Sequence, residues 1–134
     1  MRSGLKIGMT GERRFVVESA HAIDFAEGGM PAILSTPWLV WFLEHAAREA
    51  VLPFLEDGES TVGARVDVEH LAATPLGQAV TCLARVIHLE GGQITFQLEA
   101  RDPWELIARG IHRMRVIQVE RLARRVDAKR SQTR

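Results

Sequence analysis

Cysteine is nearly absent from this 134-residue chain, which has Cys82 alone. A single cysteine forms no internal disulfide, and no second one is present to complete a thiolate zinc site. Long apolar runs are also missing, because the longest one, Pro37 to Leu43, ends at Glu44, far short of the roughly 20 residues that span a bilayer. The charged start of the chain is not followed by the apolar segment of a signal peptide. We therefore expect a cytoplasmic protein without a membrane segment.

The motifs of several large enzyme classes are missing too. There is no GxSxG nucleophile elbow, no Walker loop and no GxGxxG fingerprint after a strand, which removes the commonest hydrolase, nucleotide and dinucleotide functions. The five histidines show no HExxH spacing and have no cysteine partners. The sequence therefore predicts no metal site.

The chain has no net charge, with 17 basic and 17 acidic residues, but the two signs are unevenly distributed. Residues 121–134 contain six basic residues and one acidic residue, whereas the first 120 contain 11 basic and 16 acidic residues. No aromatic residue interleaves the basic charges, so we expect no nucleic-acid binding. We interpret residues 1–120 as one domain and residues 121–134 as a basic, solvated C-terminal tail.

The order of the predicted elements indicates the fold class. Period-two alternation and β-branched residues predict strands over residues 13–18, 62–70, 78–89, 94–101 and 105–120. In the second of these, Val62, Val66 and His70 are expected on one face and Gly63 on the other. Tight turns such as Glu90-Gly91-Gly92-Gln93 join the later strands and leave neighbours antiparallel. One helix, preceded by a long loop, interrupts this order. The sequence therefore predicts an α+β fold in which a curved antiparallel sheet wraps around one buried helix.

The helix begins near Thr36-Pro37 and ends at Pro53. We expect the Thr36 hydroxyl to cap it, with Pro37 in the first helical position, where no amide hydrogen is needed. The helix is apolar around most of its circumference, which indicates burial. Glu44 nevertheless lies in line with the apolar residues Ala47 and Val51. An unpaired carboxylate in such a place costs several kcal/mol, so Glu44 is a candidate for function.

Three polar residues in apolar settings remain as candidates for chemistry: Thr36, Glu44 and His70. Capping alone accounts for Thr36, and a histidine at a strand end often has only a structural role. The arrangement is more informative, because Thr36 and Glu44 lie about 12 Å apart along the helix axis, so a long substrate could run between them. A helix N-terminus also offers free amide hydrogens to a carbonyl oxygen that develops negative charge.

These residues occur in a longer pattern. Ser35-Thr36 is followed by Glu44, by Gly63, and by the segment His70-Leu71-Ala72-Ala73-Thr74-Pro75-Leu76-Gly77. Gly110-Ile111-His112 follows in the last predicted strand. This pattern resembles the hot-dog-fold thioesterases of the fluoroacetyl-CoA thioesterase type, and the resemblance covers nearly the whole chain.

The resemblance implies a hot-dog fold and a homodimer, with a dimer of dimers as the larger alternative. It also implies hydrolysis of acyl-CoA thioesters near the dimer interface, with coenzyme A as part of the substrate and no separate cofactor. Carried over by motif, Thr36 would orient the thioester, Glu44 would attack the carbonyl or activate water, and His70 would move the proton. Gly63 would let the backbone approach the acyl group, and Met30 and Leu34 would line its pocket.

Two departures from the family pattern limit the resemblance. The segment before the helix, from Gly29 to Leu34, contains no aromatic residue, so fluoroacetyl-CoA is not assigned as the substrate. The last strand reads His112-Arg113-Met114-Arg115, with arginine displaced from its expected place, so the basic tail is an alternative source of phosphate contacts. Two other functions stay open: a non-catalytic protein that binds acyl-CoA or a small ligand, and a hot-dog hydratase or dehydratase. The second would need an Asp beside His70, which we do not find.

Overall fold

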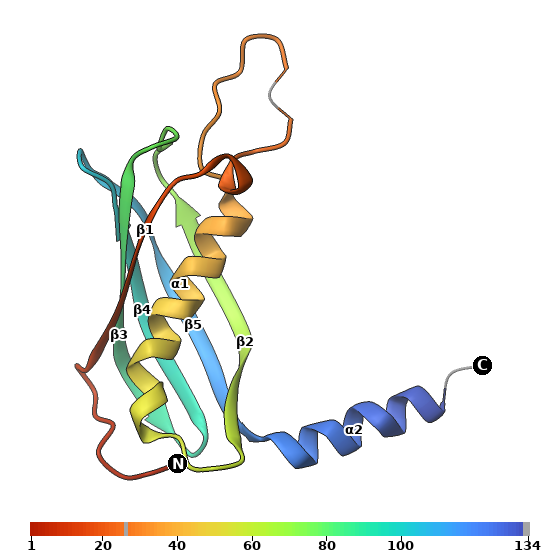
Figure 1. Cartoon of the computed structure of the whole chain (residues 1–134). Helices are drawn as coiled ribbons and strands as arrows, with labels where there is room; N and C mark the ends of the chain where they lie inside the picture. Colours follow the sequence, from red (N-terminus) through yellow and green to blue (C-terminus); the bar gives the residue numbers. More distant parts are fainter. Residues whose placement is uncertain (26, 133–134) are drawn as a thin grey trace.

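Five antiparallel strands form one curved sheet in the computed structural model, which describes residues 1–25 and 27–132 (Figure 1). The strands are β1 (Thr10–Val16), β2 (Glu59–His70), β3 (Ala79–Glu90), β4 (Gln93–Arg101) and β5 (Leu106–Gln118). They lie side by side in the order β1-β3-β4-β5-β2, so β1 and β2 are the two edges. The predicted α+β fold, with an antiparallel sheet wrapped around one helix, is confirmed.

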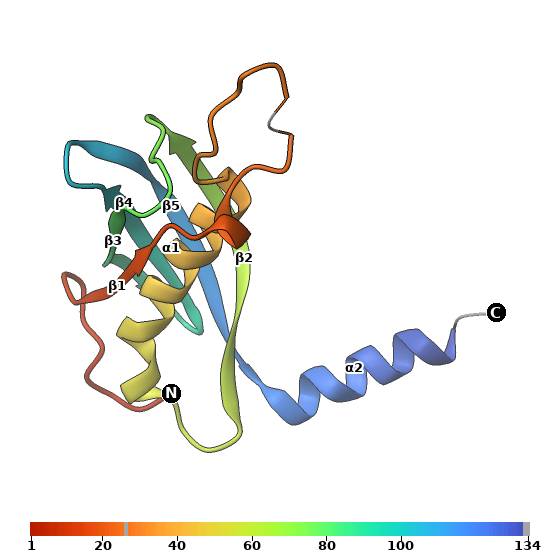
Figure 2. The ribbon, with the colours of Figure 1, turned by 45° about the horizontal axis from the view of Figure 1, so that its top comes forward.

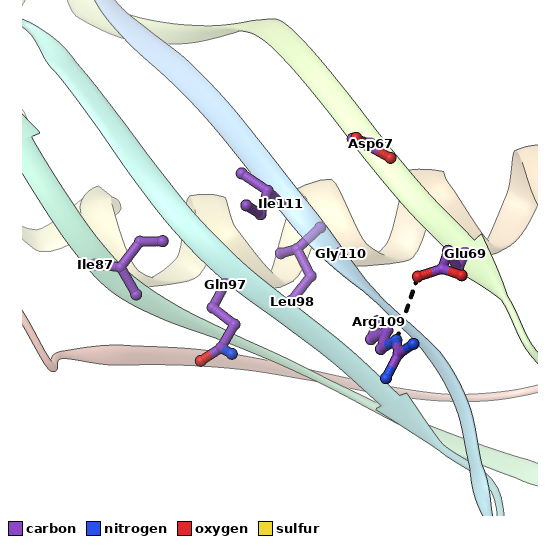
Figure 3. A pocket seen from close by; sticks show the side chains of 8 residues that line it. All are labelled: Asp67, Glu69, Ile87, Gln97, Leu98, Arg109, Gly110 and Ile111. Carbon is purple, nitrogen blue, oxygen red and sulfur yellow. Dashed lines mark hydrogen bonds and ion pairs between the residues drawn. The ribbon is translucent and has the colours of Figure 1, made fainter.

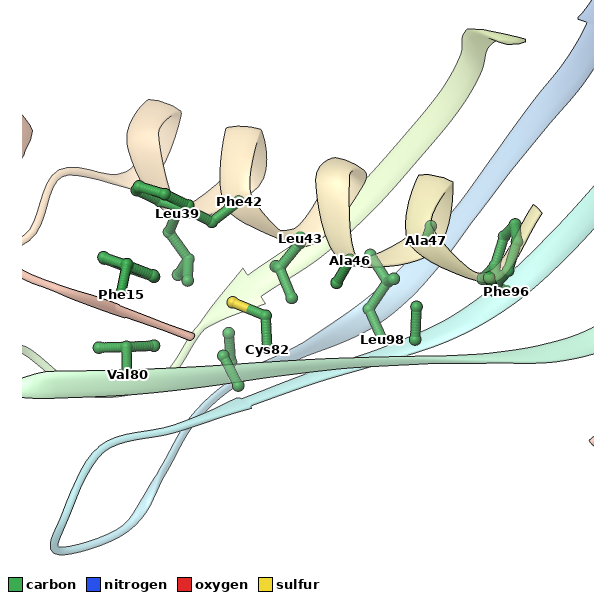
Figure 4. Packing of buried hydrophobic residues seen from close by; sticks show 14 of the residues in the cluster. Phe15, Leu39, Phe42, Leu43, Ala46, Ala47, Val80, Cys82, Phe96 and Leu98 are labelled. Carbon is green, nitrogen blue, oxygen red and sulfur yellow. The ribbon is translucent and has the colours of Figure 1, made fainter. Parts of the chain in front are cut away.

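Helix α1 (Thr36–Val51) lies across the concave face of the sheet (Figures 1 and 4). Its buried stripe consists of seven apolar residues: Leu39, Phe42, Leu43, Ala46, Ala47, Ala50 and Val51. The facing residues Ile94, Phe96 and Leu98 of β4 are at most 1% exposed, as their alternation predicts. A Cβ atom at Gly11 would overlap the carbonyl oxygen of Ala46, so this glycine allows α1 to lie close to β1.

Two short 3-10 helices and a buried cysteine complete this layer. The 3-10 turns are Ser19–His21, which follows β1, and Leu52–Phe54, which ends α1 at the predicted proline stop. Cys82 projects from β3 into the core (Figure 4). Burial raises the pKa of its thiol to about 12, so the thiol stays protonated and inert at neutral pH.

The C-terminal segment is the main departure from the expected fold. The sequence predicts a basic, solvated tail after residue 120; this segment is exposed, but it is also helical, because the chain continues from β5 directly into helix α2 (Val119–Ser131). This helix points away from the sheet and α1, and none of its residues is buried (Figures 1 and 2). In the part of the chain that the structure describes, no helix is both long enough and apolar enough to cross a bilayer.

Candidate functional site

Thr36 is the first residue of α1 and not its cap, which corrects the prediction from the sequence. The N-cap is Ser35, whose side-chain oxygen accepts a hydrogen bond from the Trp38 amide at 3.4 Å. The Thr36 hydroxyl is therefore available for another partner. Its Oγ1 lies 2.8 Å from Nδ1 of His70, the last residue of β2. The helix start and the strand end thus bring two of the three candidate catalytic residues into contact.

His70 has one ring nitrogen in a hydrogen bond and the other without a partner. Its Nε2 is buried and has no hydrogen-bond partner. Burial lowers the pKa of His70, and a hydrogen bond with the backbone at Ala72 opposes this effect in part. The imidazole is therefore neutral at pH 7, and its Nε2 has no hydrogen-bond partner in the described part of the chain. Thr36 and His70 line a hollow of about 280 Å³ together with apolar neighbours: Ile33, Leu71, Ala72 and Ala73.

Glu44 lies in a second hollow, of about 180 Å³, between α1, β2 and β5. Its neighbours Ala47 and Val51 are fully buried, whereas Glu44 itself is half-buried at the edge of the helix that faces β2. The lining residues are Glu44, His45, Arg48, Thr61, Val62, Gly63, His112 and Met114. Glu44 is therefore reached from solvent through this hollow, and the expected burial on an apolar stripe is wrong.

Gly63 faces Glu44 because β2 contains a bulge. Gly63 pairs with Met114, but the next paired residue is Arg65, opposite Arg113, so Ala64 is an extra residue. Opposite residues of antiparallel strands share a face, which places Gly63 on the face of the buried Met114. The sequence predicted the other face for Gly63, because simple alternation takes no account of a bulge.

The missing side chain of Gly63 leaves space beside Glu44. A Cβ atom at Gly63 would lie 3.4 Å from Oε2 of Glu44 and 3.5 Å from Cε1 of His112. These distances are at the short end of van der Waals contact. Gly63 therefore forms an open wall against which a small group could approach the carboxylate.

His112 is a site residue to which the sequence assigned no catalytic or binding role. It is 1% exposed, and its Nδ1 donates a hydrogen bond to the carbonyl oxygen of Arg65 at 3.2 Å. Burial lowers the pKa of His112, while the Arg65 carbonyl and the charge of Glu44 raise it in part. The hydrogen bond between His112 and Arg65 links the bulge in β2 to β5. The Gly-x-His pattern at residues 110–112 was the available signal for this residue.

The three candidate catalytic residues form two groups and not one cluster. No hydrogen bond or ion pair joins Glu44 to Thr36 or His70 within the described residues. The eight residues between Thr36 and Glu44 correspond to about 12 Å along α1. Both hollows are bordered by β2, so the two groups lie along the same edge of the sheet.

The two pocket residues predicted from the loop before α1 lie in different surroundings. Leu34 is 1% exposed and belongs to the hydrophobic core, with its amide bonded to the Thr74 carbonyl. It lines neither hollow, because the bridge that it forms with Ala22 turns it inward. Met30 is 42% exposed in the loop and is available to a ligand.

The largest described hollow, of about 410 Å³, lies on the other face of the sheet (Figure 3). Figure 3 shows α1 behind the sheet and the ion pair between Arg109 and Glu69, 3.3 Å apart, in front of it. This hollow is remote from Thr36 and Glu44, so we do not assign the chemistry to it. Among residues 1–25 and 27–132, no three His, Cys, Asp or Glu side chains form a group that could hold a metal ion.

Comparisons with known proteins agree with the sequence pattern. A family model described as fluoroacetyl-CoA-specific thioesterase matches residues 16–120. The fluoroacetyl-CoA thioesterase of Streptantibioticus cattleyicolor is 31% identical over an alignment of 137 positions, which covers 96% of this chain and 97% of that protein.

Solved structures give the same result. A structure of the fluoroacetyl-CoA thioesterase FlK has a TM-score of 0.88 and 31% identity, and the match covers 95% of this chain and 98% of that one. A hypothetical protein of Thermus thermophilus, described as a thioesterase superfamily member, has a TM-score of 0.87 and 29% identity, with 98% and 99% covered.

Proposed function

The chain belongs to the family of fluoroacetyl-CoA-specific thioesterases, and from this premise we propose that it hydrolyses small acyl-CoA thioesters with Thr36, Glu44 and His70. As a member of this family it is a thioester hydrolase. Its substrate is an acyl-CoA, and the proposed reaction uses no separate cofactor. The cytoplasmic location expected from the sequence stays a prediction.

The observation that carries the proposal is the Thr36–His70 pair. The 2.8 Å contact holds the imidazole by Nδ1, and the buried Nε2 is left without a partner beside an open hollow. A neutral imidazole held in this way can take up or deliver a proton near pH 7. In the proposed reaction His70 first takes up a proton and then passes it to the departing thiolate, and Thr36 orients the thioester or the carboxylate product.

Glu44 supplies the attacking group in this proposal, from the second chain of the dimer proposed below, because within one chain it lies about 12 Å along α1 from Thr36. A half-buried carboxylate either attacks the thioester carbonyl itself or removes a proton from an attacking water molecule. The space in front of Gly63 admits the acyl group next to Oε2. In the first route the carboxylate displaces the thiolate and forms an anhydride with the enzyme, which water then hydrolyses; in the second, water adds to the carbonyl as Glu44 takes its proton. In both routes the carbon–sulfur bond breaks, the thiolate takes up a proton, and the carboxylate product is released after water has reacted.

The lining of the Thr36–His70 hollow is mainly apolar, whereas several polar side chains border the Glu44 hollow. Ile33, Leu71 and Ala72 surround the Thr36–His70 hollow, which has no aromatic side chain in its lining. Phe25, in the preceding loop, is 64% exposed and lies in neither lining. We therefore propose short or branched aliphatic acyl groups as the first substrates to test.

We also propose a homodimer formed through β2. This edge strand is 12 residues long and pairs on one side only, with β5. An open edge of this length attracts a further strand, and Val62 and Val66 on it are 36% and 37% exposed. A second β2 strand would continue the sheet and border both hollows. Light scattering should give twice the 15.0 kDa chain mass, and a monomer would refute this assembly.

The test of the function is release of free thiol from short, branched and aromatic acyl-CoA substrates, measured with a thiol-reactive dye. Cys82 is fully buried and protonated, so the folded protein adds no background signal. We expect Glu44→Gln to lower kcat by about a thousandfold, the usual size of a lost acid–base group. Glu49→Gln, the same change at an exposed position of the same helix, should leave kcat unchanged.

The circular dichroism spectrum and the light-scattering mass of Glu44→Gln should match those of the wild type, which shows that the fold and the assembly are unchanged. Full activity of Glu44→Gln would contradict its assigned role. Binding of acyl-CoA without turnover across the whole panel would favour the non-catalytic binding protein instead. A hydratase has no support in the site, since Thr36 is the side-chain partner of His70 among the described residues.

A further inference from the structure

Helix α2 continues directly from β5, the strand that carries His112 and Met114 of the Glu44 hollow. Its first residue follows Gln118, which pairs with Glu59 at the start of β2. The amide of Val119 donates to the carbonyl of Gly58 at 2.8 Å, which fixes the root of the helix to the start of β2. Beyond this point α2 runs away from the domain (Figures 1 and 2). Nearly all of it lies after residue 120, where the match to the family model ends.

The charges of α2 are strongly one-sided. Its 13 residues include two acidic side chains and five basic ones: Arg121, Arg124, Arg125, Lys129 and Arg130. Two of the arginines pair with the acids of the same helix, Arg124 with Glu120 at 3.2 Å and Arg130 with Asp127 at 4.0 Å. The remaining arginines, Arg121 and Arg125, form no ion pair with a carboxylate in the described part of the chain.

Arg121 and Arg125 are four residues apart, so they occupy the same side of α2. Like charges at this spacing destabilise a helix, and an exposed helix of this length has little intrinsic stability of its own. An anion bound between the two guanidinium groups would remove the repulsion. Guanidinium groups bind phosphate oxygens in pairs, and the spacing on one helix face suits two neighbouring phosphates.

The distance from the Glu44 hollow to these arginines is similar to the length of extended coenzyme A between its sulfur and its first phosphorus atom. Four residues of β2 separate Gly63 from Glu59, which is about 13 Å. The two arginines lie within about 10 Å of the start of α2. The arm of coenzyme A from sulfur to the first phosphorus spans about 16 Å when extended, because each of its roughly 13 bonds advances it by about 1.2 Å.

We propose that Arg121 and Arg125 of α2 bind the phosphates of the acyl-CoA whose thioester lies beside Glu44. This inference rests on the proposed function, because it uses the same substrate and the same hollow. Arg48 lies on the route as a half-buried cation, with Nη2 donating to Ser60 at 3.4 Å. The two phosphorus centres of the pyrophosphate and the ribose phosphate give the ligand several negative charges.

The net charge of residues 1–120 explains why a basic helix is needed to attract the phosphates. The first 120 residues have 16 acidic and 11 basic side chains, so their net field repels a polyanion. Glu56 and Glu59 lie near the root of α2, where the N-terminal amine compensates them at 3.8 Å and 2.7 Å. The attraction for the substrate phosphates therefore comes from α2.

The test compares acyl-CoA with the same acyl group on pantetheine, which keeps the thioester and the arm but has no phosphates. In the full-length chain, Arg121→Ala/Arg125→Ala should raise KM for acyl-CoA about fivefold and leave KM for acyl-pantetheine and both kcat values unchanged. The matched control, Arg124→Ala/Arg130→Ala, removes the same charge from the two arginines that already have partners. Its KM for acyl-CoA should stay close to that of the wild type.

A second readout, calorimetric binding of free coenzyme A and of pantetheine, separates this inference from the proposed function. Tighter binding of coenzyme A that is lost in Arg121→Ala/Arg125→Ala supports the phosphate site even if no thioester is hydrolysed, in which case only the proposed function fails. Equal effects of the two double variants, or equal effects on both substrates, overturn the inference. Binding of a duplex oligonucleotide through α2, with KM for acyl-CoA unchanged, also overturns it.

Discussion

Replacing Thr36 with valine separates a catalytic role from a capping role. Valine has nearly the shape of threonine and removes the hydroxyl that lies 2.8 Å from Nδ1 of His70. Nε2 of His70 is already unpartnered, so the ring would lose its side-chain bond. A hydrogen bond to an imidazole that becomes charged in the transition state is worth about 2 kcal/mol, which corresponds to a roughly 30-fold loss in kcat/KM when it is removed.

The stability of the same variants is the second half of the experiment. Because Ser35 caps α1, Ser35→Ala should cost about 1 kcal/mol of unfolding free energy and leave kcat/KM nearly unchanged. Thr36→Val should lower kcat/KM far more than Ser35→Ala does, and Thr36→Ser should restore most of the activity. The assays are thiol release and urea denaturation. A Thr36→Val protein that is destabilised like Ser35→Ala but fully active would refute the assignment.

Two further predictions concern pH and the space beside Glu44. Burial lowers the pKa of His70 and His112, so below pH 6.5 the unfolded chain takes up protons first. The free energy of unfolding should therefore decrease as pH falls from 6.5 through the folded-state pKa values. In urea denaturation, His112→Asn should show a smaller decrease over this pH range than the wild type. An equal decrease in the two proteins would contradict this prediction. Gly63→Val should lower kcat/KM for a branched acyl-CoA by about tenfold, because its side chain fills the hollow, and less for acetyl-CoA; equal losses for both would argue against acyl binding there.

Much of the fold could be predicted from the sequence because the alternation of apolar residues and the positions of the turn residues indicate the same strands. Alternation in β4 placed Ile94, Phe96 and Leu98 in the core, and the Gly91-Gly92 turn marked the hairpin. The start of α1 was found within one residue. The cap itself was misassigned, since Ser35 and Thr36 have the same capping chemistry and only the fold shows which hydroxyl faces His70.

The remaining differences have specific physical causes. The bulge at Ala64 reverses the alternation of β2, and no local residue pattern marks it, so Gly63 was expected on the wrong face. Leu34 was expected in the pocket because it precedes the helix, but its bridge to Ala22 buries it. Helix α2 had a signal in Val119, Leu122 and Val126, at helical spacing, which the basic composition of the tail concealed.

The central claim is that the Thr36–His70 pair and Glu44 act on one substrate although they lie in two hollows. A double-mutant cycle of Thr36→Val and Glu44→Gln, with kcat/KM for a short acyl-CoA as the readout, tests it most directly. Residues that act in one chemical step are strongly non-additive, so we predict that the double variant loses no more activity than Glu44→Gln alone. Losses that multiply, or a Glu44→Gln variant with wild-type kcat/KM, would contradict the account.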